Sequence, residues 1–573
     1  MNLEISIVIP THNRCQMLLS VLAALARQTF DPQGYEVIVV ADGCQDDTVS
    51  AIKGLITPFH LILIEQPDSG PGVARNRGAE MASAPILMFL DDDVEPEPQL
   101  VMAHLDAHKK RPGDIILGYS PFSDELDQGD YANIELKKYW SNLFEMQEKI
   151  THRFKNWDLT TANMSISLDL FKRFGGFDEK LSKIGACEDT ELGLKLIERH
   201  IQFRFAREAA GRHHAKRPLK SHLRRQYNRG RAHVVIIRKH PETIFLFPLV
   251  DIINFKTTNQ PLKLIYNFKK LLIKLIWLNS TLANNLNLGL QLLLHLSSIF
   301  KNYELSQYFL IKLYNYNYLR GIQAELTSLE AAKQLAEEAL NVLIYFNEID
   351  IDIKTEFSRL EEILSRQPID GVWLHYGDQL IGRIEPVVGY EQLRPPHIYN
   401  ALYSFITNTK YPIWNNKELA PLLLPFLAQL PNALLLDKRL SVDEKLTIDQ
   451  GWHESEDRNG IKTRWIVDKA ILPIYSNKIC MARMDFRAKS LYHSRTLEIS
   501  VGDQSVGKWI IPTEFIEITS EIPISIGLNA LWLHVLDGCN KLGDHWRLSS
   551  MLNTDSRCSS IAFQNIAIMS SME

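Results

Sequence analysis

The sequence predicts an N-terminal α/β domain with a mostly parallel sheet, followed by a helical region and a C-terminal all-β sandwich. The α/β class rests on apolar runs that alternate with segments of helix length before residue 95. The later classes rest on Leu-, Ile- and Asn-rich helical patterns after residue 240 and on alternating runs with turn signals after residue 440. We therefore expect three parts, at residues 1–240, 241–440 and 441–573.

Four apolar runs define the predicted sheet. Each run is too continuous for a strand with one face in water, and enough chain separates neighbouring runs to form a helix. The runs cover residues 5–9, 36–40, 61–65 and 86–90, and polar residues follow every one of them. Because ligands bind beyond the carboxyl ends of the strands in an open α/β sheet, these polar residues should converge on one crevice.

The overall charge excludes a chain held to nucleic acid by bulk positive charge, because 63 Lys and Arg stand against 68 Asp and Glu. Six cysteines lie far apart without a C-x-x-C pair, so neither a disulfide framework nor a zinc ribbon is expected. The opening residues lack a signal-peptide pattern, and no run approaches ~18 uncharged apolar residues. We expect a cytoplasmic protein without a nucleic-acid partner.

Two acidic groups carry the clearest chemical signal. Asp91, Asp92 and Asp93 follow the fourth run, where carboxylates can hold a divalent cation that also binds substrate phosphates. Solvated turn residues are the alternative interpretation of this triplet. Glu188 and Asp189 open a helical pattern, and stabilisation of a helix N-terminus by negative charge is the alternative for this pair.

Histidine and basic residues follow these acids along the chain. His213 or His214 would complete a mostly carboxylate metal site, although a surface or core histidine is the commoner case. Residues 216–239 carry nine Lys or Arg and no acid, which predicts either a solvated face or a site for a phosphate or an anionic acceptor. The Gly-rich residues 70–78 lack dinucleotide and P-loop spacing, but they can begin a helix whose N–H groups face an anion.

Five ordered motifs resemble glycosyltransferase family 2, inverting nucleotide-sugar transferases of the GT-A fold. The motifs are SIVIPTHNR, EVIVVADG, GPGVARNRGAEMASAPILMFLDDDVEP, ANMSISLDLFKRFGGFDE and EDTEL, and the resemblance covers about residues 3–240. It implies a Rossmann-like GT-A catalytic domain that moves a sugar from a nucleotide-sugar donor, a UDP-sugar first of all. The acceptor would be a hydroxyl of a glycan, a lipid-linked saccharide or a protein.

The resemblance also implies a donor site and a metal site. Asp42 matches the family's uracil-binding aspartate, and Arg75 matches a position near the base or the diphosphate. The residues implied for the nucleotide-sugar are Thr11, Asn13, Arg14, Asp42, Arg75, Asp91 and Asp92. The ligands implied for Mn²⁺ or Mg²⁺ are Asp91, Asp93 and either His213 or His214. Neighbours in an extended segment point opposite ways, so the choice between Asp92 and Asp93 stays open.

For catalysis, the resemblance implies Asp189 as general base beside Glu188, with Asn163 and Met164 on the acceptor side. The carboxylate would take the proton of the acceptor hydroxyl while that hydroxyl displaces the nucleotide from the opposite face, which inverts the anomeric centre. This fits the independent chemistry, because sugar transfer needs a general base and stabilisation of the departing diphosphate.

Departures and alternatives limit this interpretation. Processive synthases that resemble the family carry Q-x-x-R-W and transmembrane helices, whereas Gln226 and Arg229 are followed here by Gly230, so a membrane-channel synthase is not expected. A catalytically silent GT-A scaffold or glycan-binding protein is the alternative from another class, and the retained acidic residues argue against it. A nucleotidyltransferase would need a Gly-rich pyrophosphorylase loop and a lysine where the chain reads THNR.

Two later features bear on partners. Residues 261–278 carry four lysines and no acid on a helical apolar pattern, and we favour an inter-domain helix over a helix lying on an anionic membrane. The C-terminal part resembles β-sandwich modules appended to some bacterial glycosyltransferases. There Trp452, Trp509 or Trp546 would stack on sugar rings if exposed, but core positions are commoner. A dimerisation or docking module is an equal alternative, which leaves a homo-oligomer open.

Overall fold

The computed structural model of the chain describes most of the first 407 residues and the strands of the C-terminal part. The described residues are 3–123, 131–214, 217–247, 280–299, 303–342, 344–407, 438–440, 452–458, 461–466, 469–476, 480–490, 494–501, 504–524, 527–537, 540–541, 558–559 and 561–570. The chain forms two compact units, one of residues 1–351, 356–373 and 383–397 and one of residues 352–355, 374–382 and 398–573. The predicted boundaries at residues 240 and 440 stay predictions.

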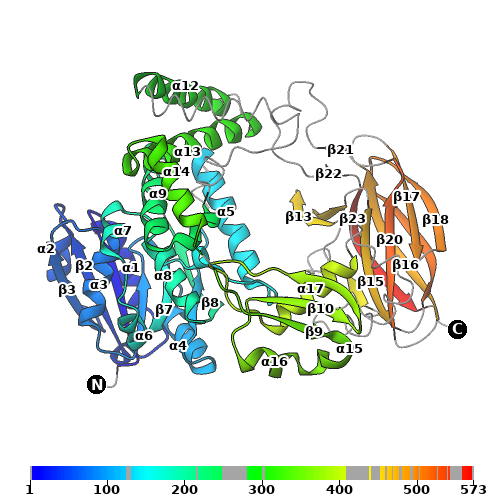
Figure 1. The fold of residues 1–573 in the computed structure, drawn as a ribbon, viewed down its shortest axis with the longest axis horizontal. Coiled ribbons are helices and arrows are strands. Elements are labelled where there is room, and N and C mark those ends of the chain that lie inside the picture. The colour runs from blue at the N-terminus through cyan, green and yellow to red at the C-terminus, as the bar shows by residue number, and fades with distance from the viewer. Residues whose placement is uncertain are drawn as a thin grey trace. The chain divides into compact units, whose positions relative to one another are not determined.

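An eight-stranded sheet organises the N-terminal part, in the order β3-β2-β1-β4-β7-β6-β8-β5 (Figure 1). Four of its seven strand pairings are parallel, so the predicted mostly parallel sheet is confirmed. All four predicted runs are strands, β1 to β4. The strands are β1 (Ile5–Thr11), β2 (Tyr35–Asp42), β3 (His60–Gln66), β4 (Ile86–Leu90), β5 (Val94–Pro96), β6 (Ile115–Tyr119), β7 (Asn163–Ser167) and β8 (Phe203–His213).

Helices cover both faces of this sheet. Ile7 of β1 packs in one core cluster with residues of α1 and α4, whereas its neighbour Val8 packs in another with residues of α3, α6 and α8. Successive residues of a strand point to opposite faces, so burial of both neighbours explains the continuous apolar runs. The helices of this part are α1 (Cys15–Leu25), α2 (Thr48–Lys53), α3 (Pro71–Met81), α4 (Leu100–Lys110), α5 (Tyr131–Glu148), α6 (Leu168–Arg173), α7 (Glu179–Ile184), α8 (Glu188–Glu198) and α9 (Leu219–Lys239).

A glycine brings α3 close to the sheet. A Cβ added to Gly78 would lie 2.3 Å from Cγ1 of Val8 and 3.3 Å from Cγ2 of Val40, so a side chain there would push the helix away. Gly70, with a φ of 92°, precedes the helix, and Pro71 occupies its first turn. Because Gly78 sets the distance between α3 and the sheet, it also sets the position of the buried Arg75 on the same helix.

A second close contact joins α9 to the helices that follow. A Cβ on Gly230 would lie 2.0 Å from the carbonyl oxygen of Tyr318, and one on Gly321 would lie 1.9 Å from that of Tyr227. The helices of this region are α12 (Ser280–Ile299), α13 (Tyr303–Glu325) and α14 (Leu329–Leu340). The space at Gly230 explains physically why no tryptophan follows Arg229. No described helix has the length and apolarity needed to cross a membrane.

Residues 344–407 contain a three-stranded sheet in the order β11-β10-β9, which the helical pattern did not predict. Its strands are short and only partly buried, so apolar and polar residues do not alternate clearly along them. The elements are β9 (Glu348–Asp352), α15 (Ile353–Glu356), α16 (Leu360–Arg366), β10 (Gly371–Tyr376), β11 (Gln379–Ile384) and α17 (Pro395–Thr407). The predicted basic helix at 261–278 lies outside the described residues.

The C-terminal part is the predicted β-sandwich. One antiparallel sheet has the order β13-β14-β23-β16-β19, with β12 beside β23, and the other has the order β15-β20-β17-β18. Leu497 and Leu531 of one sheet share a core with Phe486 and Phe563 of the other. The strands are β12 (Lys438–Leu440), β13 (Trp452–Arg458), β14 (Ile461–Ile466), β15 (Lys469–Ser476), β16 (Cys480–Ser490), β17 (Arg495–Val501), β18 (Gln504–Ile511), β19 (Ile516–Ile524), β20 (Gly527–Val535), β21 (Asn540–Lys541), β22 (Cys558–Ser559) and β23 (Ile561–Ser570).

The candidate sugar-stacking tryptophans do not gather into a described surface. Trp509 is partly buried and packs against the sandwich core, with its ring 2.6 Å from the position of a Cβ on Gly507. The side chain of Trp452 and the whole of Trp546 lie outside the described residues. Trp509 is thus a packing residue of the sandwich.

Candidate active site

The aspartate triplet meets the first strand's polar residues, as expected for carboxyl ends of neighbouring parallel strands. The Thr11 hydroxyl donates to Oδ2 of Asp92 at 2.7 Å. One terminal nitrogen of Arg14 donates to Oδ1 of Asp92 and to Oδ2 of Asp93, both at 2.8 Å. Asp92 and Asp93 are 5% and 2% exposed. Two carboxylates are therefore held almost out of water by a single half-exposed arginine.

Burial and neighbouring charge act differently on these two aspartates. Burial raises the pKa of Asp92 to about 6, despite the opposing effect of Arg14 and Thr11. Burial alone would also raise the pKa of Asp93, but His213 and Arg14 outweigh it and hold that pKa below its ordinary value. Asp93 is therefore the member of the pair that stays ionised over the whole physiological range.

The two adjacent histidines face different carboxylates. β5 pairs with β8 so that Val94 lies opposite His213, and this register brings His213 Nε2 to 3.1 Å from Oδ1 of Asp93. The ring of Phe122 stacks on His213 at 4.5 Å and fixes its plane. His214 turns instead to Glu95, 3.2 Å from its Oε2. The backbone N–H of His214 donates to the backbone oxygen of Asp93, but of the two side chains it is that of His213 that lies against an aspartate of the triplet.

Asp93 and His213 each keep one ligand atom without a hydrogen-bond partner. Oδ1 of Asp93 and Nε2 of His213 are both buried and unsatisfied, and the line between them lacks the alignment of a hydrogen bond. The two atoms attract each other as an ion pair, but without an aligned hydrogen bond they gain less than they would from a fully satisfied one. A carboxylate oxygen and an imidazole nitrogen are a donor set that suits Mn²⁺, so these residues fit a divalent cation.

Arg75 joins two acidic motifs that lie 97 positions apart in the chain. Its terminal nitrogens contact Oδ1 of Asp91 at 2.7 Å and Oε1 of Glu188 at 3.4 Å. The guanidinium is 5% exposed and comes from α3, whose position on the sheet Gly78 determines. The three predicted motifs around residues 75, 91 and 188 thus form one continuous charged chain.

Glu188 and Asp189 begin α8. Cys187 precedes them in the left-handed region, with a φ of 65°, and Oδ1 of Asp189 accepts a hydrogen bond from the backbone of Thr190 at 2.7 Å. Burial, reinforced by the charge of Asp189, raises the pKa of Glu188 to about 7. Burial also raises the pKa of Asp189, although Arg75 and Arg225 oppose it. A carboxylate with a raised pKa is a stronger base than an ordinary aspartate.

Asp42 and Asn13 fasten the loops that surround the sheet edge. The Asp42 carboxylate accepts hydrogen bonds from the Gln66 side chain and from the backbone of Ser69 and Gly70, at 2.8–2.9 Å. Asn13, with a φ of 53°, accepts from the backbone of Gln45 at 2.6 Å. Their implied contact with a nucleotide stays a prediction.

Asn163 and Met164 lie on β7, where Asn163 is opposite Leu90, the residue before Asp91. Asn163 donates to the backbone oxygen of Ala209 at 2.9 Å, while its own oxygen lies 2.9 Å from His104 Nε2. Met164 is fully buried in the core between sheet and helices. Both belong to β7, a strand that extends the sheet beyond β4, and their side chains are occupied within the fold. Their assignment to the acceptor side stays a prediction.

Two arginines near the site were not singled out within the basic run. Arg217 acts on the charge of Asp93, and Arg225 acts on that of Asp189. Burial and the nearby charge of Arg225 lower the pKa of Arg217 to about 10. The run contains nine Lys or Arg residues, and the sequence does not indicate which of them face the carboxylates. That choice depends on how this part of the chain packs against the sheet.

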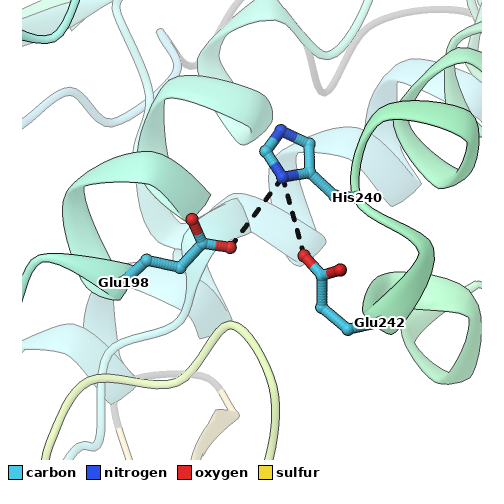
Figure 2. A group of neighbouring side chains, drawn as sticks. All are labelled: Glu198, His240 and Glu242. Atoms are coloured by element: carbon cyan, nitrogen blue, oxygen red, sulfur yellow. Dashed lines mark ion pairs between the residues drawn. The ribbon is translucent and has the colours of Figure 1, made fainter. Parts of the chain in front are cut away.

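Another group of metal-ligand residue types lies at the far ends of α8 and α9. In Figure 2, the imidazole of His240 stands between the carboxylates of Glu198 and Glu242, at 3.9 and 3.6 Å from its Nδ1. Among the described residues, this is the group of three whose ligand atoms lie within 4.8 Å of one another. The other ring nitrogen faces Glu191 at 3.4 Å, and Lys239 and Lys195 also pair with Glu191. Protein cations thus already neutralise Glu191, the carboxylate next to this group.

Fold and site define an α/β protein with a buried acidic cluster at the carboxyl ends of its strands. Residues 6–175 match the model of the family Glycosyl transferase family 2, which confirms the predicted resemblance over that segment. Validoxylamine A glucosyltransferase of Streptomyces hygroscopicus subsp. limoneus is 34% identical over 233 residues, 36% of this chain and 51% of the relative. Glycosyltransferase AglE of Haloferax volcanii is 28% identical over 234 residues, 40% of this chain and 73% of the relative.

The matches to solved structures have low sequence identity and low TM-scores. S. aureus TarS 1-349 is 14% identical with a TM-score of 0.34, and the match covers 61% of this chain and 94% of that one. Mannosyltransferase PcManGT from Pyrobaculum calidifontis, in complex with GDP-Man and Mn²⁺, is 14% identical with a TM-score of 0.34, covering 59% and 80%. The chain spans about half the length of the Streptomyces relatives it matches.

Proposed function

We propose that the chain is a metal-dependent inverting glycosyltransferase that moves a sugar from a nucleotide-sugar, UDP-sugars first, to a hydroxyl of a saccharide, lipid-linked or protein acceptor. The observation that carries the proposal is the Arg75 bridge between Asp91 and Glu188. This bridge joins the aspartate triplet, which lies within the segment 6–175 that matches the family model, to the Glu188–Asp189 pair.

The residues divide the chemistry between them. Asp93 and His213 would hold the divalent ion, which supplies electrophilic stabilisation of the leaving diphosphate when bound. Arg217 and Arg225 add positive charge on the same side as the carboxylates. Thr11, Asp42 and Arg75 would orient the nucleotide from the loops after the strands. The surrounding burial excludes water and strengthens each of these charge interactions.

Asp189 would act as general base. Its carboxylate takes the proton of the acceptor hydroxyl as the oxygen bonds to the anomeric carbon, while the bond from that carbon to the diphosphate oxygen breaks. The nucleoside diphosphate leaves with the electron pair, and attack from the opposite face inverts the centre. The raised pKa of Asp189 makes its carboxylate a stronger base than an ordinary aspartate. Glu188, paired with Arg75, would keep Asp189 in place.

The substitution Asp189→Asn tests this assignment. We expect turnover to fall by about 10³-fold, since a positioned general base contributes roughly 10²–10⁴-fold. Affinity for the donor nucleotide should change less than about 2-fold, because the base contacts the acceptor. The measurements are nucleotide release from sugar nucleotides in the presence of saccharide acceptors and calorimetric binding of UDP, GDP and dTDP.

Asp169→Asn is the matched control, because Asp169 is an aspartate whose side chain is 77% exposed and pairs only with Arg173 one turn away. It should retain full turnover. Equal turnover in Asp189→Asn would overturn the base assignment alone. Absence of nucleotide binding by the unaltered chain with any divalent metal would overturn the transferase proposal and favour a silent scaffold.

A further inference from the structure

One face of α12 is an apolar stripe that the described fold leaves in water. Leu288, Leu292 and Leu296 recur every four residues and are 63%, 59% and 41% exposed, and Leu293 beside them is 44% exposed. Residues four apart lie on one face of a helix. In Figure 1, α12 is the dark green helix whose label stands above that of α13.

The opposite face of α12 accounts for its attachment to the fold. Leu294, 3% exposed, packs with Leu310 and Leu313 of α13, and the Ser297 and Ser306 hydroxyls lie 3.0 Å apart. A surface helix normally carries charged residues on the face turned away from its core. None of the 20 residues of α12 is Asp, Glu, Lys or Arg. The exposed face of α12 therefore presents leucines and uncharged polar residues in place of the usual charged ones.

The charge of the neighbouring sequence indicates what covers the stripe. Residues 261–325 carry seven Lys or Arg and two Glu, in a chain whose net charge is −5. Tyr303, at the start of α13, is 60% exposed, and tyrosine is a residue type favoured where apolar and polar layers meet. Positive charge and apolar surface together fit an anionic lipid surface.

A second copy of the chain fits this face less well. In a two-fold dimer each patch meets the same patch of the other copy, so the net positive charge of the sequence that flanks α12 on both sides would be paired with the same charge. A helix of this length that fails the requirement for crossing a bilayer can still lie in the headgroup layer with its apolar face inward. We propose that the stripe of Leu288, Leu292, Leu293 and Leu296 docks the protein on anionic membranes.

Co-sedimentation of the full chain with vesicles tests the proposal without any assay of catalysis. The vesicles contain phosphatidylcholine alone or phosphatidylcholine with phosphatidylglycerol. We expect binding to the anionic vesicles, weaker binding at high salt because exposed charges are screened, and little binding to the neutral ones. The double variant Leu292→Glu with Leu296→Glu should bind anionic vesicles at least about 10-fold more weakly, because it places two acids on the apolar face.

Ile56→Glu, at a 97% exposed position outside α12, is the matched control and should bind like the unaltered chain. Leu292→Asn with Leu296→Asn repeats the test without adding charge, in case the glutamates disturb folding, which circular dichroism would report. Equal binding by all variants, or no binding by the unaltered chain, overturns the proposal. If the leucine substitutions leave vesicle binding unchanged but lower the mass measured by sedimentation velocity, the stripe binds a second copy of the chain and the membrane proposal is overturned.

Discussion

Histidines and carboxylates meet at two places in the N-terminal part, and the protein treats the two groups differently. At the sheet edge, the buried Asp92 and Asp93 share one terminal nitrogen of Arg14, and His213 lies 3.1 Å from Asp93. In the first turn of α8, the fully buried Glu191 pairs with three cationic side chains, which are Lys195, Lys239 and His240. Two buried carboxylates therefore share one arginine and one histidine in the first group, whereas three cations surround a single carboxylate in the second.

We interpret the first group as a binding site and the second as a network that stabilises the fold. Buried carboxylates with little counter-charge reduce stability, and charged groups with strongly shifted pKa values cluster at functional sites. Buried ions with their partners in place stabilise the elements they join, here α8, α9 and the segment carrying Glu242 (Figure 2). The residue types and short distances of Glu198, His240 and Glu242 would by themselves favour a metal site there. The lysines that already neutralise the neighbouring Glu191 argue against a metal ion at this position.

The largest expected effect on the stabilising network comes from Glu191→Gln. Removing this charge leaves Lys195, Lys239 and His240 around a neutral group, and loss of one partner of a buried ion pair costs about 3–5 kcal/mol. We expect the free energy of unfolding to fall by about 3 kcal/mol in urea denaturation, near the lower limit because glutamine still accepts hydrogen bonds. Nucleotide affinity of the folded protein should not change.

Glu198→Gln is the matched control for Glu191, because its side chain lies on the same helix but is 42% exposed. Exposed ion pairs contribute little, so we expect a loss below about 1 kcal/mol. If Glu191→Gln left stability unchanged and weakened nucleotide binding, the network would belong to the binding site and the comparison would fail.

A smaller effect is expected from pH acting on His240. Burial alone would lower its pKa, but Glu191, Glu242 and Glu198 together raise it to about 9 from 6.5. A histidine with a raised folded pKa contributes stability that is full below about pH 6.5 and is lost as the pH rises through about 9. We expect His240→Gln to cost about 2 kcal/mol at pH 6 and progressively less toward pH 10.

Urea denaturation of the unaltered chain and of His240→Gln at several pH values measures this difference. His60→Gln is a suitable control, because its side chain is 61% exposed. A His240→Gln difference that stayed constant from pH 6 to pH 10 would contradict an ion-paired imidazole and would favour a neutral one.

The sequence predicted the parts of this molecule that follow local rules. Continuous apolar runs located β1 to β4, and their parallel order explains why Thr11 and Asp92 meet. The sandwich followed from alternation and turn signals. Local patterns could not predict contacts set by register or helix crossing. The choice of His213 over His214 depends on the pairing of β5 with β8, and the burial of Asn163 depends on its contact with Ala209.

The most direct test of the contrast between the two groups is calorimetric titration of the full chain with UDP in the presence and absence of Mn²⁺. We predict Mn²⁺-dependent binding that weakens at least about 100-fold in Asp93→Asn and stays within about 2-fold in Glu242→Gln, since losing a metal-site residue typically costs 10–100-fold or more. Unchanged binding in Asp93→Asn with loss in Glu242→Gln would contradict the account and place the metal at His240 instead.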